Sequence, residues 1–181
     1  MPAETALIIG LGNPGPRYAE IRHNLGAMAL EELLSRSPGA RLSSHRRTNT
    51  DIAQFRLSPG GPAVVAARLR CPMNLSGGPT KALCSFFHVE PTRLFVIHDE
   101  LEAPFGSVAL RPGGGDHGHN GLKSISSSLK TRAYVRVSLG IGRPPGRMDP
   151  ARFVLQAFSR SERADLPIIC ADAADAIEAA L

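Results

Sequence analysis

The chain contains four histidines and one aspartate that could take part in acid–base chemistry. They are His23, His98, Asp99, His117 and His119. A histidine can accept a proton from water near neutral pH, and a carboxylate can orient the imidazole that does so. The amides of Asn13, Asn74 and Asn120 could bind a carbonyl group or its oxyanion. Together these residue types suit attack of water on an activated ester or a related acyl group, although each histidine could also be an ordinary core or surface residue.

Neither a metal site nor a nucleophilic serine is predicted. His117 and His119 stand close together, but no second pair of ligands occurs at a known zinc spacing. The cysteines Cys71, Cys84 and Cys170 form no C-x-x-C motif, and the chain has no G-x-S-x-G motif. We therefore expect a reaction that uses no metal and no cofactor.

One glycine-rich segment matches a dinucleotide-binding pattern. Gly10-Leu11-Gly12-Asn13-Pro14-Gly15 has the form G-x-G-x-x-G, and acidic residues follow about 20 positions later. In that pattern a helix begins within the glycines, whereas Pro14 and Pro16 would interrupt its first turn. We expect instead a tight loop that presents Asn13, and a nicotinamide-dependent oxidoreductase is the weakest of three functional hypotheses.

The elements that must position these residues alternate between strands and helices. This order predicts one α/β domain over residues 1–181, with a twisted mixed β-sheet flanked by helices. A capping box, Ser159-x-x-Glu162, predicts the start of the last helix. The expected strands are 6–9, a hairpin of 53–57 with 63–69, 94–97, 108–110 and 134–139, and the other expected helices are 24–35, 80–87 and 121–129.

Four of the polar residues follow predicted strands. They are Asn13, Asn74, Asp99 and Asn120. In open α/β sheets, ligands bind beyond the carboxyl ends of the strands. We therefore expect these four side chains to gather at one edge of the sheet.

The charge of the chain points to a polyanionic partner. It has 21 Lys and Arg against 16 Asp and Glu, a net charge of +5, and only 5% aromatic residues. This balance favours a nucleic acid held through its phosphates rather than by base stacking, although many enzymes without such a partner are mildly basic. No apolar run is long enough for a membrane span, and the sparse cysteines and absence of a leader pattern predict the cytoplasm.

Several motifs, taken in order, resemble one known family. They are Gly10-Leu11-Gly12-Asn13-Pro14-Gly15, Tyr18, Arg22-His23-Asn24-x-Gly26, Met73-Asn74-x-Ser76-Gly77, His98-Asp99-Glu100-Leu101 and Gly113-Gly114-Gly115-x-x-Gly118-His119-Asn120-Gly121-Leu122. The chain is similar over most of its length to the bacterial-type peptidyl-tRNA hydrolases. Members of that family hydrolyse the ester between a nascent peptide and the 3′ end of tRNA, which recycles peptidyl-tRNA from stalled translation.

The resemblance implies a role for each matching residue. His23 would be the general base that activates water, Asp99 would orient its imidazole, and Asn13 would help to distinguish peptidyl from aminoacyl esters. The residues expected to bind the substrate or its tRNA are Tyr18, Asn74, Asn120 and Arg111. The resemblance also implies a monomer. A non-catalytic RNA-binding protein on the same fold is the second hypothesis.

The chain departs from the family pattern at three positions. Ile21 replaces a threonine, Pro72 replaces an aromatic residue, and Ser138 replaces the second arginine of its strand. We expect the tRNA acceptor arm to pass the face that carries Ser138 and Arg111. The alternative is that Ser138 points into the protein, where an arginine would be buried.

Overall fold

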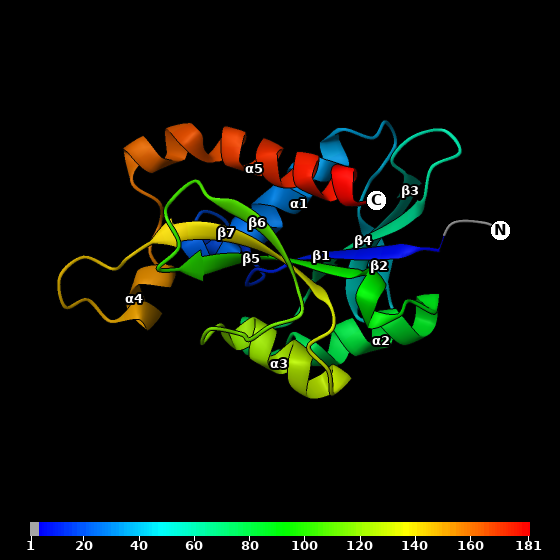
Figure 1. Cartoon of the computed structure of the whole chain (residues 1–181), viewed down its shortest axis with the longest axis horizontal. Coiled ribbons are helices and arrows are strands. Elements are labelled where there is room, and N and C mark those ends of the chain that lie inside the picture. Colours follow the sequence, from blue (N-terminus) through cyan, green and yellow to red (C-terminus); the bar gives the residue numbers. More distant parts are fainter. Residues whose placement is uncertain (1–3) are drawn as a thin grey trace.

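A computed structural model describes residues 4–181, in which seven strands form one sheet in the order β2-β3-β4-β1-β5-β7-β6 (Figure 1). Residues 1–3 of the predicted domain lie outside this description. The strands are β1 Ala6–Gly10, β2 Ser43–His45, β3 Thr50–Arg56, β4 Ala63–Leu69, β5 Leu94–Leu101, β6 Val108–Pro112 and β7 Val135–Gly142. The helices are α1 Leu25–Ser35, α2 Gly77–Phe87, α3 Asn120–Leu129, α4 Pro150–Val154 and α5 Arg160–Ala180, with 3-10 turns η1 Pro16–Tyr18, η2 Arg22–Asn24, η3 Met73–Leu75 and η4 Pro91–Arg93.

The middle of the sheet is parallel and its two edges are antiparallel. β4, β1, β5 and β7 run in the same direction, whereas β2 and β3 form an antiparallel edge on one side and β6 on the other. β1 lies in the centre and is buried along its whole length, as expected for a strand covered on both faces. This arrangement confirms the α/β fold with a mixed sheet.

Two helical layers cover the sheet, with α1 and α5 on one face and α2 and α3 on the other (Figure 1). Successive residues of β1 contribute to the two layers in turn: Ile8 packs in the core under α1 and α5, and Ile9 in the core under α2 and α3. α1 lies very close to the sheet, because a Cβ on Gly26 would collide with the carbonyl oxygen of Ile97. This close packing places η2, the turn that precedes α1, beside β5.

Most of the predicted elements are present, with different ends. The hairpin is confirmed as β3 and β4, and the capping box at Ser159 begins α5 as predicted. β5 continues to Leu101, so that Asp99 lies within the strand and does not follow it. β2 and α4, which are only 3 and 5 residues long, were not predicted from the sequence. No helix among residues 4–181 is both long and apolar enough to cross a membrane.

Candidate active site

The imidazole of His23 lies against the carboxylate of Asp99. His23 belongs to η2 and Asp99 to β5, and Nδ1 of His23 is 2.9 and 3.0 Å from the two carboxylate oxygens. Burial by itself would raise the pKa of Asp99, but contacts with His119 and His23 outweigh it, and the pKa lies below its usual range. Because the ionised carboxylate only accepts hydrogen bonds, Nδ1 of His23 donates and Nε2 is left to accept a proton.

His119 donates a second hydrogen bond to the same carboxylate. It precedes α3, and its Nδ1 accepts hydrogen bonds from the backbone N–H of Gly121 (3.1 Å) and Leu122 (3.4 Å). That nitrogen therefore carries no proton, and Nε2–H donates to Oδ1 of Asp99 at 2.9 Å. His119 was a candidate for acid–base chemistry from the sequence, but no role was predicted for it. The sequence predicted a helix that begins at Gly121, whereas α3 begins one residue earlier, at Asn120, which makes His119 its N-cap.

His98 lies behind Asp99 and is 1% exposed. Its Nδ1–H donates to the backbone carbonyl of Asp99 (2.8 Å), and its Nε2 accepts from the hydroxyl of Ser138 (3.0 Å). Burial, with the nearby His119, lowers the pKa of His98 to about 4. His98 is therefore neutral at pH 7 and serves as packing and support for Asp99.

Ser138 thus points into the protein, which corrects one sequence-based expectation. It is 2% exposed, and its hydroxyl is used by His98. An arginine at this position would place a charged group in the buried space next to His98. The expectation that Ser138 faces the tRNA is wrong, and the inward alternative is right.

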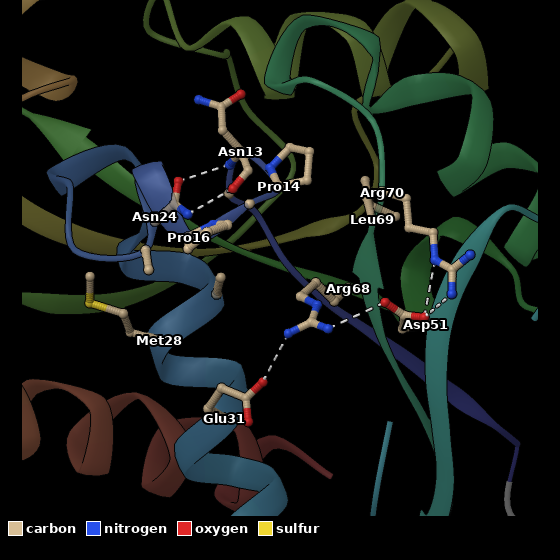
Figure 2. Close-up of a pocket in the computed structure, with 14 residues that line it drawn as sticks. Asn13, Pro14, Pro16, Asn24, Met28, Glu31, Asp51, Arg68, Leu69 and Arg70 are labelled. Atoms are coloured by element: carbon tan, nitrogen blue, oxygen red, sulfur yellow. Dashed lines mark hydrogen bonds and ion pairs between the residues drawn. The ribbon is translucent and has the colours of Figure 1, made fainter. Parts of the chain in front are cut away.

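Asn13 is held in one orientation by three hydrogen bonds. Its backbone N–H donates to Oδ1 of Asn24 (2.8 Å) and its carbonyl accepts from Nδ2 of Asn24 (2.9 Å), as Figure 2 shows. Its own Oδ1 accepts from the backbone N–H of Met73 at 2.9 Å. Because Oδ1 is fixed by this bond, the NH₂ group of the same amide has a defined orientation. The glycine segment leads into η1, and α1 begins only at Leu25, so no helix starts at the glycines as a dinucleotide site requires.

Asn120 reaches the site by a route that the sequence analysis did not anticipate. β6 is antiparallel to β7, so the carboxyl end of β6 lies opposite Val135, at the amino end of β7. The glycine-rich loop that follows runs back along β7, where Arg136 Nε donates to the carbonyl of Gly113 at 2.9 Å. The prediction that Asn120 follows the end of a strand at the ligand-binding edge is therefore wrong, although Asn120 still arrives there as the first residue of α3.

Several of the candidate site residues line one cavity of about 290 Å³. Its lining includes His23, Asp99, His119 and Asn120. α4 and the residue before it form another wall, through Asp149, Pro150, Ala151 and Val154. A second cavity of about 440 Å³ lies beside Asn13 and Asn24, with Glu31, Asp51, Arg68 and Arg70 in its lining (Figure 2).

The other substrate-binding residues expected from the sequence lie at the surface. Asn74 is exposed on η3, next to the Met73 N–H that Asn13 holds. Tyr18 is partly exposed on η1, 5.6 Å from the Arg17 guanidinium. Arg111 is exposed on the edge strand β6, opposite Arg136, and the structure does not bring it to the cavity of His23.

His23, Asp99 and His119 also form the one group of potential metal ligands found among residues 4–181, with ligand atoms within 4.8 Å of one another. A metal at this place would require Nε2 of His119 to lose its proton. Nδ1 of the same ring already accepts from the backbone of α3, so the ring would have to become an anion. The donor set fits hydrogen bonding better than metal ligation.

Comparison with known proteins shows to which family the chain belongs. The family model described as "Peptidyl-tRNA hydrolase" matches residues 7–181. "Peptidyl-tRNA hydrolase 1" of Corynebacterium glutamicum is 59% identical over 172 residues, which cover 95% of this chain and 93% of that protein. "Peptidyl-tRNA hydrolase" of Rhodococcus opacus is 49% identical over 100% of this chain and 94% of its own length. The crystal structure of peptidyl-tRNA hydrolase from Acinetobacter baumannii superposes with a TM-score of 0.84 at 30% identity, over 94% of this chain and 83% of that one. The chain belongs to the peptidyl-tRNA hydrolase family.

Proposed function

We propose that this chain hydrolyses the ester between a peptide and the 3′ end of tRNA, with His23 as the general base. The observation that carries the assignment is the contact of His23 Nδ1 with both carboxylate oxygens of Asp99. This contact leaves Nε2 of His23 as the proton acceptor at the cavity. The two other hypotheses are not favoured: the family is one of hydrolases, and the glycine segment begins no phosphate-binding helix.

The reaction needs one water molecule and one base. Nε2 of His23 removes a proton from the water while its oxygen attacks the ester carbonyl carbon, which gives a tetrahedral oxyanion. When this intermediate collapses, the bond to the 3′-oxygen of the ribose breaks, and the imidazolium returns the proton to that oxygen. Asp99 stabilises the imidazolium between the two steps, because it stays ionised and in hydrogen-bond contact.

Asn13 distinguishes a peptidyl ester from an aminoacyl ester. A peptidyl-tRNA carries an amide next to the esterified residue, whereas a free aminoacyl-tRNA carries an amino group at that place. The oriented NH₂ of Asn13 donates to the carbonyl oxygen of that amide, which an aminoacyl ester lacks. Asn74 and Asn120 donate to the other carbonyl groups of the substrate, including the developing oxyanion.

The tRNA is held mainly through its phosphates. Arg111 contributes charge on the exposed edge of the sheet, and Tyr18 contacts the tRNA end of the substrate. We propose that the protein acts as a monomer without a cofactor, in the cytoplasm, where translation produces its substrate.

The test is release of the N-acetylamino acid from an N-acetylaminoacyl-tRNA, a minimal peptidyl-tRNA, with the unacetylated aminoacyl-tRNA as the comparison substrate. We expect His23→Ala to lower kcat by about 10²–10⁴-fold, the usual contribution of a positioned general base. His88→Asn is the matched control, because His88 is exposed in a left-handed conformation at the end of α2 that asparagine tolerates. Near wild-type turnover in folded His23→Ala would refute the assignment. Binding of tRNA without release of peptide by the wild type would favour the RNA-binding hypothesis.

A further inference from the structure

The residue before His23 is a buried arginine. Arg22 is 7% exposed, and its Nη2 donates to Oε1 of Glu162 at 2.8 Å. Its Nη1 donates to the carbonyl of Phe153 at 3.4 Å, and its guanidinium carbon lies 4.1 Å from the centre of the Phe153 ring. A buried guanidinium needs such partners, because removing an unpaired charge from water is unfavourable.

All of these partners belong to one distant segment of the chain. Phe153 lies in α4 and Glu162 in the first turn of α5, more than 130 residues after Arg22. The backbone joins the same two segments, because the N–H of Arg22 donates to the carbonyl of Gln156 at 3.0 Å and Ile21 forms a β-bridge with Ala157. The catalytic turn η2 is therefore attached to α4 and the start of α5.

This distant segment is also a wall of the catalytic cavity. Pro150, Ala151 and Val154 line the cavity that contains His23 and Asp99. Figure 1 shows α4 beyond the ends toward which β5 and β7 point, apart from the two helical layers. α4 is only 5 residues long, so its position depends on its contacts with the rest of the protein. Phe153 and Val154 are buried in the core, and Arg22 contacts Phe153.

Glu162 has two functions in this arrangement. Its Oε1 accepts from the backbone N–H of Ser159 at 2.8 Å, as part of the capping box of α5, and from Arg22. Burial by itself would raise the pKa of Glu162, but the hydrogen bonds from Ser159 and the charge of Arg22 outweigh it, and the pKa is lowered. Glu162 is therefore ionised at neutral pH, and the capping box serves as the anchor for a cation on another element.

We propose that Arg22 and Glu162 are positioning residues for the hydrolysis: the ion pair between the buried guanidinium and the partly buried carboxylate fixes the turn that carries His23 relative to the α4 wall of the cavity. The inference rests on the proposed role of His23. A 3-residue 3-10 turn has little stability of its own, so an external anchor is needed to hold the base. Misplacement of a catalytic group by about 1 Å can cost about 10²-fold in rate.

The first test is Glu162→Gln, which keeps the capping acceptor and the side-chain shape but removes the charge. We expect kcat to fall by about 10–100-fold while KM changes less than about threefold, because the substrate contacts are retained and the base is displaced. Arg22→Lys keeps the charge but loses the stacking on Phe153, so its kcat should lie between those of Glu162→Gln and the wild type. Arg22→Lys also provides the test if Glu162→Gln does not fold.

The matched control is Arg36→Gln. Arg36 lies at the end of α1 and makes ion pairs to the other end of α5, at 2.7 Å with Asp175 and 3.4 Å with Glu178. Its loss destabilises the contact of α5 with α1 without touching η2, and kcat should stay within about twofold of the wild type. All variants are assayed at a temperature at which each is fully folded, with the melting temperature measured beside kcat.

A second readout separates positioning from stability. The proton on Nδ1 of His23, held by Asp99, should give a downfield NMR resonance that disappears in His23→Ala and broadens in Glu162→Gln. Unchanged kcat and an unchanged resonance in Glu162→Gln would overturn the positioning role, as would an equal loss of kcat in Glu162→Gln and Arg36→Gln. An active His23→Ala protein would instead refute the proposed function, so that the two failures are distinguishable.

Discussion

The charged side chains in the two cavities next to η2 differ in burial and in their partners. One is lined by His23 and the other by the following residue, Asn24. In the first, the Asp99 side chain is 2% exposed and receives N–H groups from two imidazoles. In the second, Asp51 pairs with Arg70 at 2.6 Å and with Arg68 at 3.3 Å, and Arg68 also lies 3.6 Å from Glu31 (Figure 2).

The difference lies in exposure to water. The side chains of Arg68 and Arg70 are 50% and 40% exposed. Ion pairs of this kind are screened and contribute about 0–1 kcal/mol each. The hydrogen bond from Arg70 lowers the pKa of Asp51 against the effect of burial. We therefore expect a charged group to have a larger effect on activity at Asp99 than at Asp51.

The largest expected effect is that of Asp99→Asn. The neutral amide cannot accept from both imidazoles or stabilise the imidazolium of His23, so kcat should fall by about 10³-fold. Steady-state hydrolysis of an N-acetylaminoacyl-tRNA at pH 7 measures this loss. Asp51→Asn is the matched substitution in the other cavity and should change kcat less than about twofold. Equal losses in the two variants would contradict the distinction between the cavities.

The second effect is a pH dependence of stability caused by His98. The pKa of His98 is about 4 in the folded protein, below the ordinary value of 6.5. Between these two pH values the unfolded chain therefore binds a proton at His98 and the native state does not. Stability should be fully present above pH 6.5 and fall as the pH decreases toward 4, by up to about 3 kcal/mol. Melting temperatures of the wild type and His98→Gln should show a flatter dependence in the variant over this range. Parallel curves would refute the neutral, buried state of His98.

Asp51 should affect stability over a different pH range. Its pKa is lowered by Arg70, so its contribution is present above the ordinary carboxyl pKa and is lost only as the pH falls further. The Asp51→Asn curve should therefore run parallel to the wild-type curve and below it above pH 5, and the two curves should converge only in stronger acid.

A smaller effect is expected from His119→Asn. Asparagine is a good N-cap and can accept from the first turn of α3, but it is too short to replace the imidazole as donor to Asp99. Loss of one hydrogen bond to a buried charge should lower kcat by about 10–100-fold, with a small change in melting temperature. An unchanged kcat would show that His23 alone determines the state of Asp99.

The smallest effect is expected from Arg70→Ala, which removes the shorter of the two ion pairs to Asp51. The free energy of unfolding should decrease by less than about 1 kcal/mol, and less still at high salt. Chemical denaturation at two ionic strengths measures both quantities. A loss of several kcal/mol, or a large loss of kcat, would contradict the expectation that the exposed ion pairs of Asp51 contribute little.

The sequence by itself determined the elements and their buried faces. The apolar run at β1, the alternation in β3 and β4, and the capping box of Ser159 and Glu162 are local patterns, and each specifies its own element through a few neighbouring residues. The motifs also identified His23, Asp99 and Asn13 as the residues of a site. Hydrophobic periodicity carries no information on which elements become neighbours.

The tertiary structure decided how those residues meet. Asp99 accepts from His23, 76 positions away, only because α1 packs against β5, and from His119 only because the loop after β6 returns along β7. The inward position of Ser138 and the pairing of Arg22 with Glu162, 140 positions apart, likewise depend on strand order and direction. Packing of the whole core determines these, because a strand's own residues are compatible with either direction of pairing and with several neighbours.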